Sequence, residues 1–168
     1  MKRITILTIE ILIAYLLQST ISPVLSVGGI VPNLLIIVTV SAGYMRGKVE
    51  GLFVGLACGF LVDISHGSLL GLYGMVYMTI GYLNGYVSKF YFKEDFSIPT
   101  LLIGASNFVA GLFYYVFEFL LRGKTNIFFY IRRIIVPELV YTVAVSIILY
   151  KLLNLVNVYF DRKKQKEV

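Results

Sequence analysis

The chain has 168 residues, of which 58% are hydrophobic and only 14% are charged. Soluble domains contain roughly 45–50% apolar and about 25% charged residues, so this composition excludes an ordinary soluble domain and predicts a membrane protein. The formal net charge is +6, but the basic residues bracket apolar runs and do not alternate with aromatic residues, which argues against nucleic acid as a partner.

Apolar runs recur along the chain at the length that membrane-spanning helices need, which is about 20 residues with a range of roughly 17–25. They cover residues 4–25, 27–44, 49–64, 69–90, 98–121 and 134–160. We expect an all-α integral membrane protein with about six transmembrane helices, in a single polytopic domain over residues 1–168. The first run follows Lys2 and Arg3, as in a signal peptide. Glu10 interrupts it and no small-residue cleavage site follows, so we expect it to remain as the first span.

Lysine and arginine predict the orientation, because cytoplasmic loops carry an excess of both. One side of these spans receives most of the basic residues: Lys2, Arg3, Arg46, Lys48, Lys89, Lys93, Arg162, Lys163, Lys164 and Lys166. The other side receives Arg122, Lys124, Arg132 and Arg133. Both termini should therefore be cytoplasmic. The outer segment TNIFFYIRRII, residues 125–135, mixes aromatic residues with arginines and predicts an interfacial helix.

The second and third runs are short, and their regularity as helices is open. A re-entrant hairpin over residues 31–64 would bring Arg46 and Lys48 to membrane depth. Because charges at that depth are costly, we expect two full spans.

Ionisable side chains within the apolar runs are the first candidates for function, because lipid disfavours charge. Glu10 lies near the inner end of the first run, where a functional role and simple contact with the interface are equally open. A second set gathers at the outer level: Asp63, Glu118, Glu138, Arg122, Arg132 and Arg133. We expect these acids and arginines to pair at the interface and to fix helix packing; a ligand site is the alternative.

Motifs for chemistry are missing from the sequence. It holds no His-Glu-x-x-His, Gly-x-Ser-x-Gly or Walker motif, so no enzymatic activity is predicted. His66 is the single histidine and Cys58 the single cysteine, which makes a zinc site of three or four ligands implausible. No metal, cofactor or catalytic residue is predicted. We interpret Asn33, Asn84 and Asn107 as interhelical hydrogen-bonding residues worth about 0.6 kcal/mol each.

Glycines recur at steps of four in the third run, at Gly51, Gly55 and Gly59, and again at Gly81 and Gly85 in the fourth. Steps of four keep residues on one slowly drifting face of a helix. Small residues let helix backbones approach closely in lipid, so this face predicts tight helix packing. The packed neighbour is either a helix of this chain or the transmembrane helix of a partner.

These glycines belong to a longer ordered pattern, best matched over residues 31–87: Pro32-Asn33-Leu34, Gly43, Gly47, Gly51, Gly55, Gly59, Asp63, Gly67, Leu70-Gly71, Gly81-Tyr82 and Gly85. The pattern resembles the family of the rod shape-determining protein MreD, which also has a proline opening the last span, here Pro137. Pro32, Asn33 and Asp63 are the family-motif positions. Asn33 departs from the family, which often has Asp there.

The resemblance implies a non-enzymatic membrane scaffold of the bacterial cell-elongation complex, located in the cell membrane. Such proteins help to organise peptidoglycan synthesis and cell shape together with an MreC-like membrane protein, the actin-like MreB, the glycosyltransferase RodA and a class B transpeptidase. Membrane lipids are the remaining expected partners.

The family is also similar in fold to the substrate-binding subunits of energy-coupling-factor vitamin transporters, which implies a compact helical bundle. That kinship supplies the alternative function, a substrate-binding subunit for small-molecule uptake. Those subunits dock through an Ala-x-x-x-Ala stripe on the first helix. The matching stripe here is Glu10, Ala14 and Gln18, whose polar ends argue against such docking.

Overall fold

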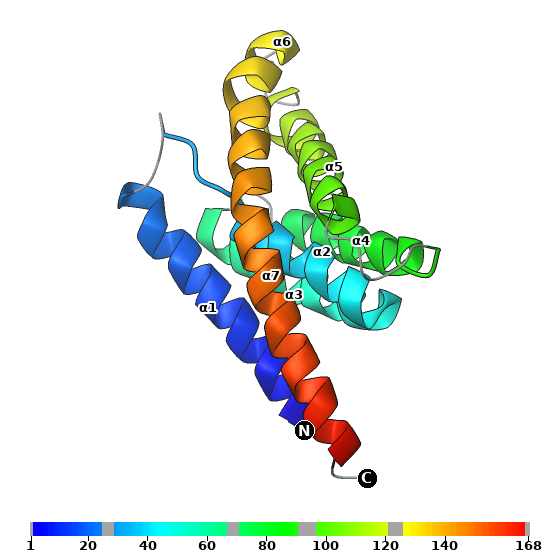
Figure 1. The fold of residues 1–168 in the computed structure, drawn as a ribbon. Coiled ribbons are helices and arrows are strands. Elements are labelled where there is room, and N and C mark those ends of the chain that lie inside the picture. Colours follow the sequence, from blue (N-terminus) through cyan, green and yellow to red (C-terminus); the bar gives the residue numbers. More distant parts are fainter. Residues whose placement is uncertain (1, 25–28, 67–70, 91–96, 121–125, 167–168) are drawn as a thin grey trace.

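A computed structural model describes residues 2–24, 29–66, 71–90, 97–120 and 126–166, and these are folded into a helical bundle (Figure 1). The elements in chain order are α1 (Lys2–Val24), α2 (Leu34–Arg46), α3 (Lys48–His66), α4 (Leu72–Val87), α5 (Ser97–Tyr114), the π-helical turn η1 (Tyr115–Leu120), α6 (Ile127–Tyr130), the π-helical turn η2 (Ile131–Ile135) and α7 (Val136–Lys166). The protein is therefore all-α. α1 begins and α7 ends toward the same end of the molecule (Figure 1).

The short helix α2 forms the centre of the bundle. Its side chains are buried without a break from Leu34 to Tyr44, and it contacts α1, α3, α4, α5 and α7. A helix that is apolar on all sides is stable only when other elements cover it completely. With 13 residues, it is about 20 Å long, shorter than the roughly 30 Å hydrocarbon core of a bilayer. Because other helices cover α2 within the bundle, its length does not have to match the thickness of the bilayer.

The bounds of α2 differ from those of the apolar run 27–44. The helix begins at Leu34, because Asn33 has non-helical backbone angles and its side chain accepts a hydrogen bond from the Ile36 N–H. Pro32 strengthens this boundary, since proline disfavours a helical conformation in the residue before it. At the other end, Gly47 alone separates α2 from α3, with φ at 98°. A positive φ is easily reached only by glycine, which explains so short a connection.

The glycine face of α3 packs along α4, and this is the most extensive helix–helix contact in the fold. A Cβ added at Gly55 would collide with the Tyr77 carbonyl, and one at Gly59 would lie 2.6 Å from the Gly74 Cα. Real Cβ atoms essentially never come so close to backbone, so glycine is required for this approach. The face thus packs against a helix of the same chain, with no space for a partner helix between α3 and α4.

The same approach extends to α2. A Cβ at Gly43 would lie 2.5 Å from the Gly81 carbonyl oxygen, and one at Gly51 would lie 2.6 Å from the Gly43 Cα. Three backbones therefore meet at Gly43, Gly51 and Gly81. Gly85 lies against the start of α3, where an added Cβ would be 2.6 Å from the Gly47 carbonyl carbon.

The segment expected to be a separate interfacial helix is instead the beginning of the last long helix. α6, η2 and α7 follow one another without a break, and residues 127–159 form one apolar helical run. Pro137 therefore lies inside this run and does not open it. A proline in a helix lacks an N–H and clashes with the carbonyl four residues earlier. The wider π-helical turn η2 ends at Ile135, two residues before Pro137, and sharp helix distortions commonly occur at prolines and at π-helical turns.

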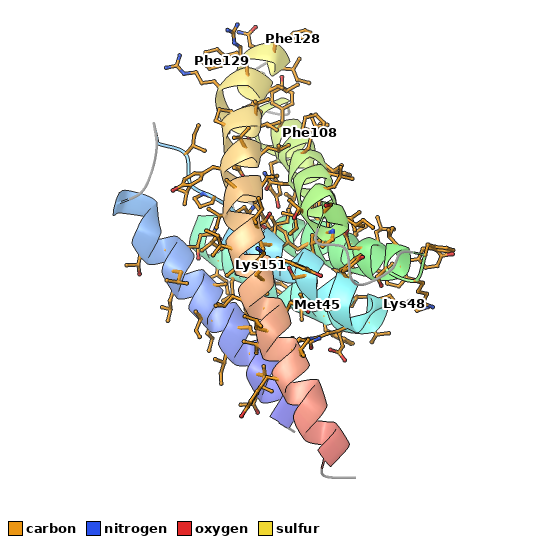
Figure 2. All side chains as sticks on the ribbon, viewed as in Figure 1. Met45, Lys48, Phe108, Phe128, Phe129 and Lys151 are labelled. Atoms are coloured by element: carbon orange, nitrogen blue, oxygen red, sulfur yellow. The ribbon has the colours of Figure 1, made fainter. Side chains whose placement is uncertain are left out.

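Among the described residues, two helical runs are long and apolar enough to cross a membrane, Ser97–Phe117 and Ile127–Tyr159, while Ile4–Thr20 and Leu34–Arg46 are shorter apolar helices. Large apolar side chains cover much of the exposed surface, including Ile64, Leu101 and Ile148, each more than 70% exposed. Phe128 and Phe129 project from the tip formed by α6 (Figure 2). Apolar exposure on this scale is unusual for a soluble monomer.

The close contact between α3 and α4 predicts that a bulky side chain on the glycine face lowers stability, whereas one on the exposed face of α3 does not. Gly55→Leu should lower the stability of the purified protein by at least about 1–3 kcal/mol, because overpacking forces the backbones apart. Thermal melting in detergent measures the loss. Ala57→Leu is the matched control, since Ala57 is exposed on the same helix. Equal melting temperatures for the two variants would contradict close packing at Gly55.

A candidate binding cavity at the Asn33 end of the bundle

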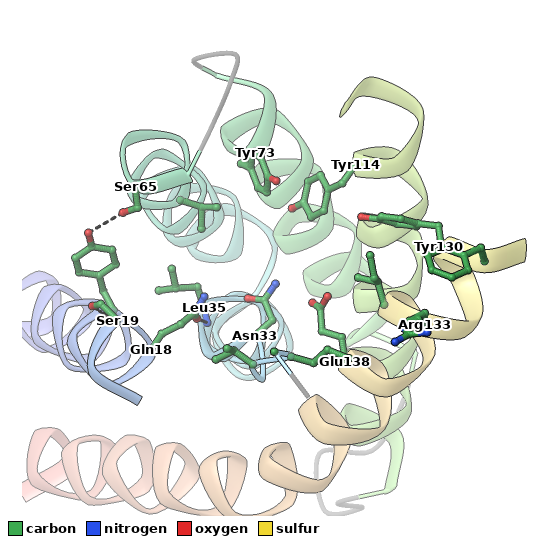
Figure 3. A pocket seen from close by; sticks show the side chains of 17 residues that line it. Gln18, Ser19, Asn33, Leu35, Ser65, Tyr73, Tyr114, Tyr130, Arg133 and Glu138 are labelled. Carbon is green, nitrogen blue, oxygen red and sulfur yellow. Dashed lines mark hydrogen bonds between the residues drawn. The ribbon is translucent and has the colours of Figure 1, made fainter. Parts of the chain in front are cut away.

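A cavity of about 790 Å³ opens at the end of the bundle where α2 and α4 begin, called here the Asn33 end (Figure 3). Segments from most of the chain contribute to it, from α1 to the start of α7. Its polar lining consists of Tyr15, Gln18, Ser19, Asn33, Ser65, Tyr73, Tyr114, Tyr130, Arg133 and Glu138. The volume is in the range of roughly 300–1,000 Å³ that is usual for small-molecule sites.

The start of α2 forms one wall, and its backbone N–H groups are satisfied by side chains from other helices. The Leu35 N–H donates to Gln18 Oε1 at 3.2 Å, and the Asn33 N–H donates to Thr142 Oγ1 at 3.1 Å. The first N–H groups of any helix lack partners inside the helix, and lipid offers none. These bonds therefore tie α1 and α7 to the start of α2.

Asn33 has a fixed orientation at this wall. Its Oδ1 accepts hydrogen bonds from the Ile36 N–H at 3.1 Å and from the Tyr77 hydroxyl at 2.8 Å. Because an amide has one oxygen and one NH₂ group, the NH₂ of Asn33 is left to face Glu138. Figure 3 shows these two side chains pointing toward each other.

Glu138, near the start of α7, lies beside Asn33 and is held by amides. Its carboxylate is hydrogen-bonded to the side chains of Asn33 and Asn107. Arg133 lines the same cavity, but its guanidinium lies over the Phe129 ring, 5.7 Å from the ring centre. Asn33 and Asn107 thus join helices as interpreted from the sequence, and the group that they join is a carboxylate.

Asp63 has a different partner from the arginine expected for it. Its Oδ1 accepts from the Tyr73 N–H at 3.0 Å and its Oδ2 accepts from the Gly74 N–H at 2.9 Å. These are N–H groups of the first turn of α4, whose N-cap, Gly71, has no side chain to bind them. A carboxylate at a helix N-terminus is favoured by both hydrogen bonding and the helix dipole. Asp63, 2% exposed, therefore caps a neighbouring helix.

The outer set of six charged residues is not assembled as one cluster among its described members. Asp63 caps α4, Glu138 is bound by amides, and Arg132 and Arg133 are exposed. The side chain of Glu118 and the whole of Arg122 lie outside the described residues, as does the side chain of His66.

The opposite end of the bundle, called the Arg46 end, contains an ion pair that sequence reasoning missed. Arg46 Nη2 lies 3.0 Å from Glu10 Oε1, and Arg46 Nε donates to Asn157 Oδ1 at 3.1 Å. The two charged side chains are only 5% and 10% exposed. Removing one partner of such a pair typically costs about 3–5 kcal/mol. The available signal was that both residues lie at the inner level of the expected spans, on different helices.

The helix cap formed by Asp63 predicts that two substitutions at this position lower stability by different amounts. Asp63→Ala loses both hydrogen bonds to α4 and should cost about 0.5–2 kcal/mol, the usual range for a helix cap. Asp63→Asn keeps one acceptor oxygen, so it should cost less than the alanine change. Thermal melting of the purified variants measures the order. Arg133→Gln is the control, and its effect should add to that of Asp63→Asn. A non-additive double variant would indicate an acid–arginine pair instead.

Together, the apolar perimeter, the capped helix starts and the buried polar contacts define an all-α protein of the membrane-embedded class. In the part of the chain that the structure describes, no three His, Cys, Asp or Glu side chains gather as metal ligands. The comparisons with known proteins name the family. The family model for the rod shape-determining protein MreD matches residues 1–158. The chain belongs to the MreD family, whose members are membrane proteins of the cell-shape apparatus and are not known as enzymes. No curated protein and no solved structure matches the chain.

Proposed function

We propose that this protein is a non-enzymatic scaffold of the bacterial cell-elongation complex that helps to organise peptidoglycan synthesis along the cell. The observation that carries this proposal is the family match over residues 1–158, nearly the whole chain. The expected direct partner is an MreC-like membrane protein, with MreB, RodA and a class B transpeptidase in the same complex.

The internal contacts support a scaffold. At each end of the bundle a buried acid binds another part of the chain, as Glu10 does with Arg46 and Asp63 does with the start of α4. Such contacts hold the helices, and with them the outer surface, in one arrangement. A fixed surface is what a protein needs in order to position partners.

The first helix argues against the uptake alternative. Docking on a coupling protein would need the stripe of Glu10, Ala14 and Gln18 to face outward. Instead Glu10 binds Arg46, Gln18 binds the Leu35 N–H, and Ala14 is only 4% exposed. The stripe packs into the bundle, so it is not free for a partner.

The distribution of charge supports an orientation with the Arg46 end in the cytoplasm and the Asn33 end outside. Arg46, Lys48 and Lys89 lie at or next to the ends of α2, α3 and α4 that meet at the Arg46 end. An excess of basic residues marks the cytoplasmic side of a membrane protein. We therefore infer a multi-pass protein of the cell membrane with both termini in the cytoplasm.

This orientation predicts which positions an impermeant thiol reagent reaches in intact cells. In a Cys58→Ser background, cysteine placed at Lys124 should react, whereas cysteine placed at Lys48 or Lys166 should react only after the cells are opened. Mass-shift labelling of the tagged protein measures the reaction. Labelling of the Lys48→Cys variant in intact cells would contradict the proposed orientation.

The scaffold function predicts an association and a cell-shape defect. The tagged chain, purified in mild detergent from its own membranes, should bring down an MreC-like protein that a tagged unrelated multi-pass protein does not. Depletion of the protein should turn rod-shaped cells round. Expression of the Ala57→Leu variant in the depleted cells should restore the rod shape. Mass spectrometry and cell-width measurements give the two readouts. Depleted cells that stay rod-shaped and a purified chain without an MreC-like partner would refute the proposal.

A further inference from the structure

The charge of Glu138 is not compensated by the contacts that the described residues make with it. Its carboxylate is bound by the side-chain amides of Asn33 and Asn107, which are neutral. An ionised carboxylate accepts about four hydrogen bonds, so these two donors leave acceptor capacity on the cavity side. A partly buried charge without a counter-charge is costly, and a ligand that brings positive charge would remove that cost.

Two further polar groups next to Glu138 have unused acceptor capacity. Among the described residues, no donor binds the buried Asn107 Oδ1, and the buried Tyr114 hydroxyl has the Tyr77 hydroxyl as its hydrogen-bonding neighbour. The amide oxygen can only accept a hydrogen bond, and the hydroxyl can accept or donate one. Buried polar groups are nearly always paired in proteins, so an acceptor without a donor requires an explanation. Of these groups, Glu138 and Tyr114 line the cavity, and their acceptor oxygens suit a ligand that donates hydrogen bonds.

Aromatic rings complete the same wall of the cavity. Tyr73 and Tyr114 stack with ring centres 4.1 Å apart, and both line the cavity with Glu138 (Figure 3). The faces of tyrosine rings attract cations. Arg133 lies nearer the exposed rim and holds its charge over Phe129, so it leaves the carboxylate free for another cation.

We propose that the cavity is a binding site for an alkylammonium or guanidinium cation, with Glu138 as the charge partner and Tyr114 beside it. A group of this kind combines positive charge with several N–H donors, which the acceptors around Glu138 require. An anion would be repelled by Glu138. This site goes beyond the scaffold function and does not depend on it. The cation comes either from a free small amine or from the ethanolamine head group of a phospholipid, since the cavity opens at one end of a membrane bundle.

The test uses the full chain in lipid nanodiscs and two arms that separate these sources. In phosphatidylcholine nanodiscs, free ethanolamine and agmatine are titrated by calorimetry, with choline as the matched control because its cation has no N–H donor. In the second arm, the melting temperature is compared between phosphatidylethanolamine and phosphatidylcholine nanodiscs with the same acyl chains. A free-amine site gives saturable binding that prefers ethanolamine or agmatine over choline. A head-group site gives a higher melting temperature in phosphatidylethanolamine.

Substitutions of residues that line the cavity test whether the amine binding or the lipid-dependent melting shift arises there. Glu138→Gln should weaken the binding by about tenfold or more, or abolish the lipid-dependent shift, because a charge-assisted hydrogen bond is lost. Tyr114→Phe should weaken the binding by about threefold, as expected for one neutral hydrogen bond. Arg132→Gln is the control, because Arg132 is exposed and does not line the cavity. If the Glu138→Gln variant does not fold, the result for the Tyr114→Phe variant decides whether the site is present. No effect in either arm, or effects that persist in the folded cavity variants, would overturn the site.

Discussion

The direct contact of three helix backbones at glycine is the constraint on which the rest of this structure depends. Gly43, Gly51 and Gly81 bring α2, α3 and α4 so close that no side chain fits between them. In lipid, helices gain little from hydrophobic burial against each other, so such close packing supplies much of the cohesion. It also buries α2 on all sides, so this helix can form the centre of the bundle although it is shorter than the hydrocarbon core of a bilayer.

A short central helix creates a second requirement, because its ends lie within the bundle and their backbone groups need partners there. Gln18 and Thr142 meet this requirement at the start of α2, and Asp63 meets it at the start of α4. Side chains from distant helices therefore converge where α2 and α4 begin. The cavity lies at this point of convergence, so its polar lining follows from the way the bundle is held together.

The two ends of the bundle differ in how their charges are balanced. At the Arg46 end, the acid of α1 binds the arginine of α2 directly. At the Asn33 end, Glu138 is bound by two neutral amides, and Arg133 is directed to an aromatic ring. The first arrangement pairs opposite charges within the chain and serves packing. The second leaves acceptor groups unpaired beside a cavity, which is the property of a binding site.

The sequence alone determined the helical class, the membrane character, the family and the glycine face of α3, because composition, run length and four-residue spacing are local properties of the chain. It did not determine the start of α2 at Leu34, since the apolar run continues through the residues before it. The partners of Asp63 and Glu138 were decided by the tertiary structure. A sequence shows that a buried carboxylate needs donors, but only the packing of distant helices decides whether arginines, amides or backbone N–H groups supply them.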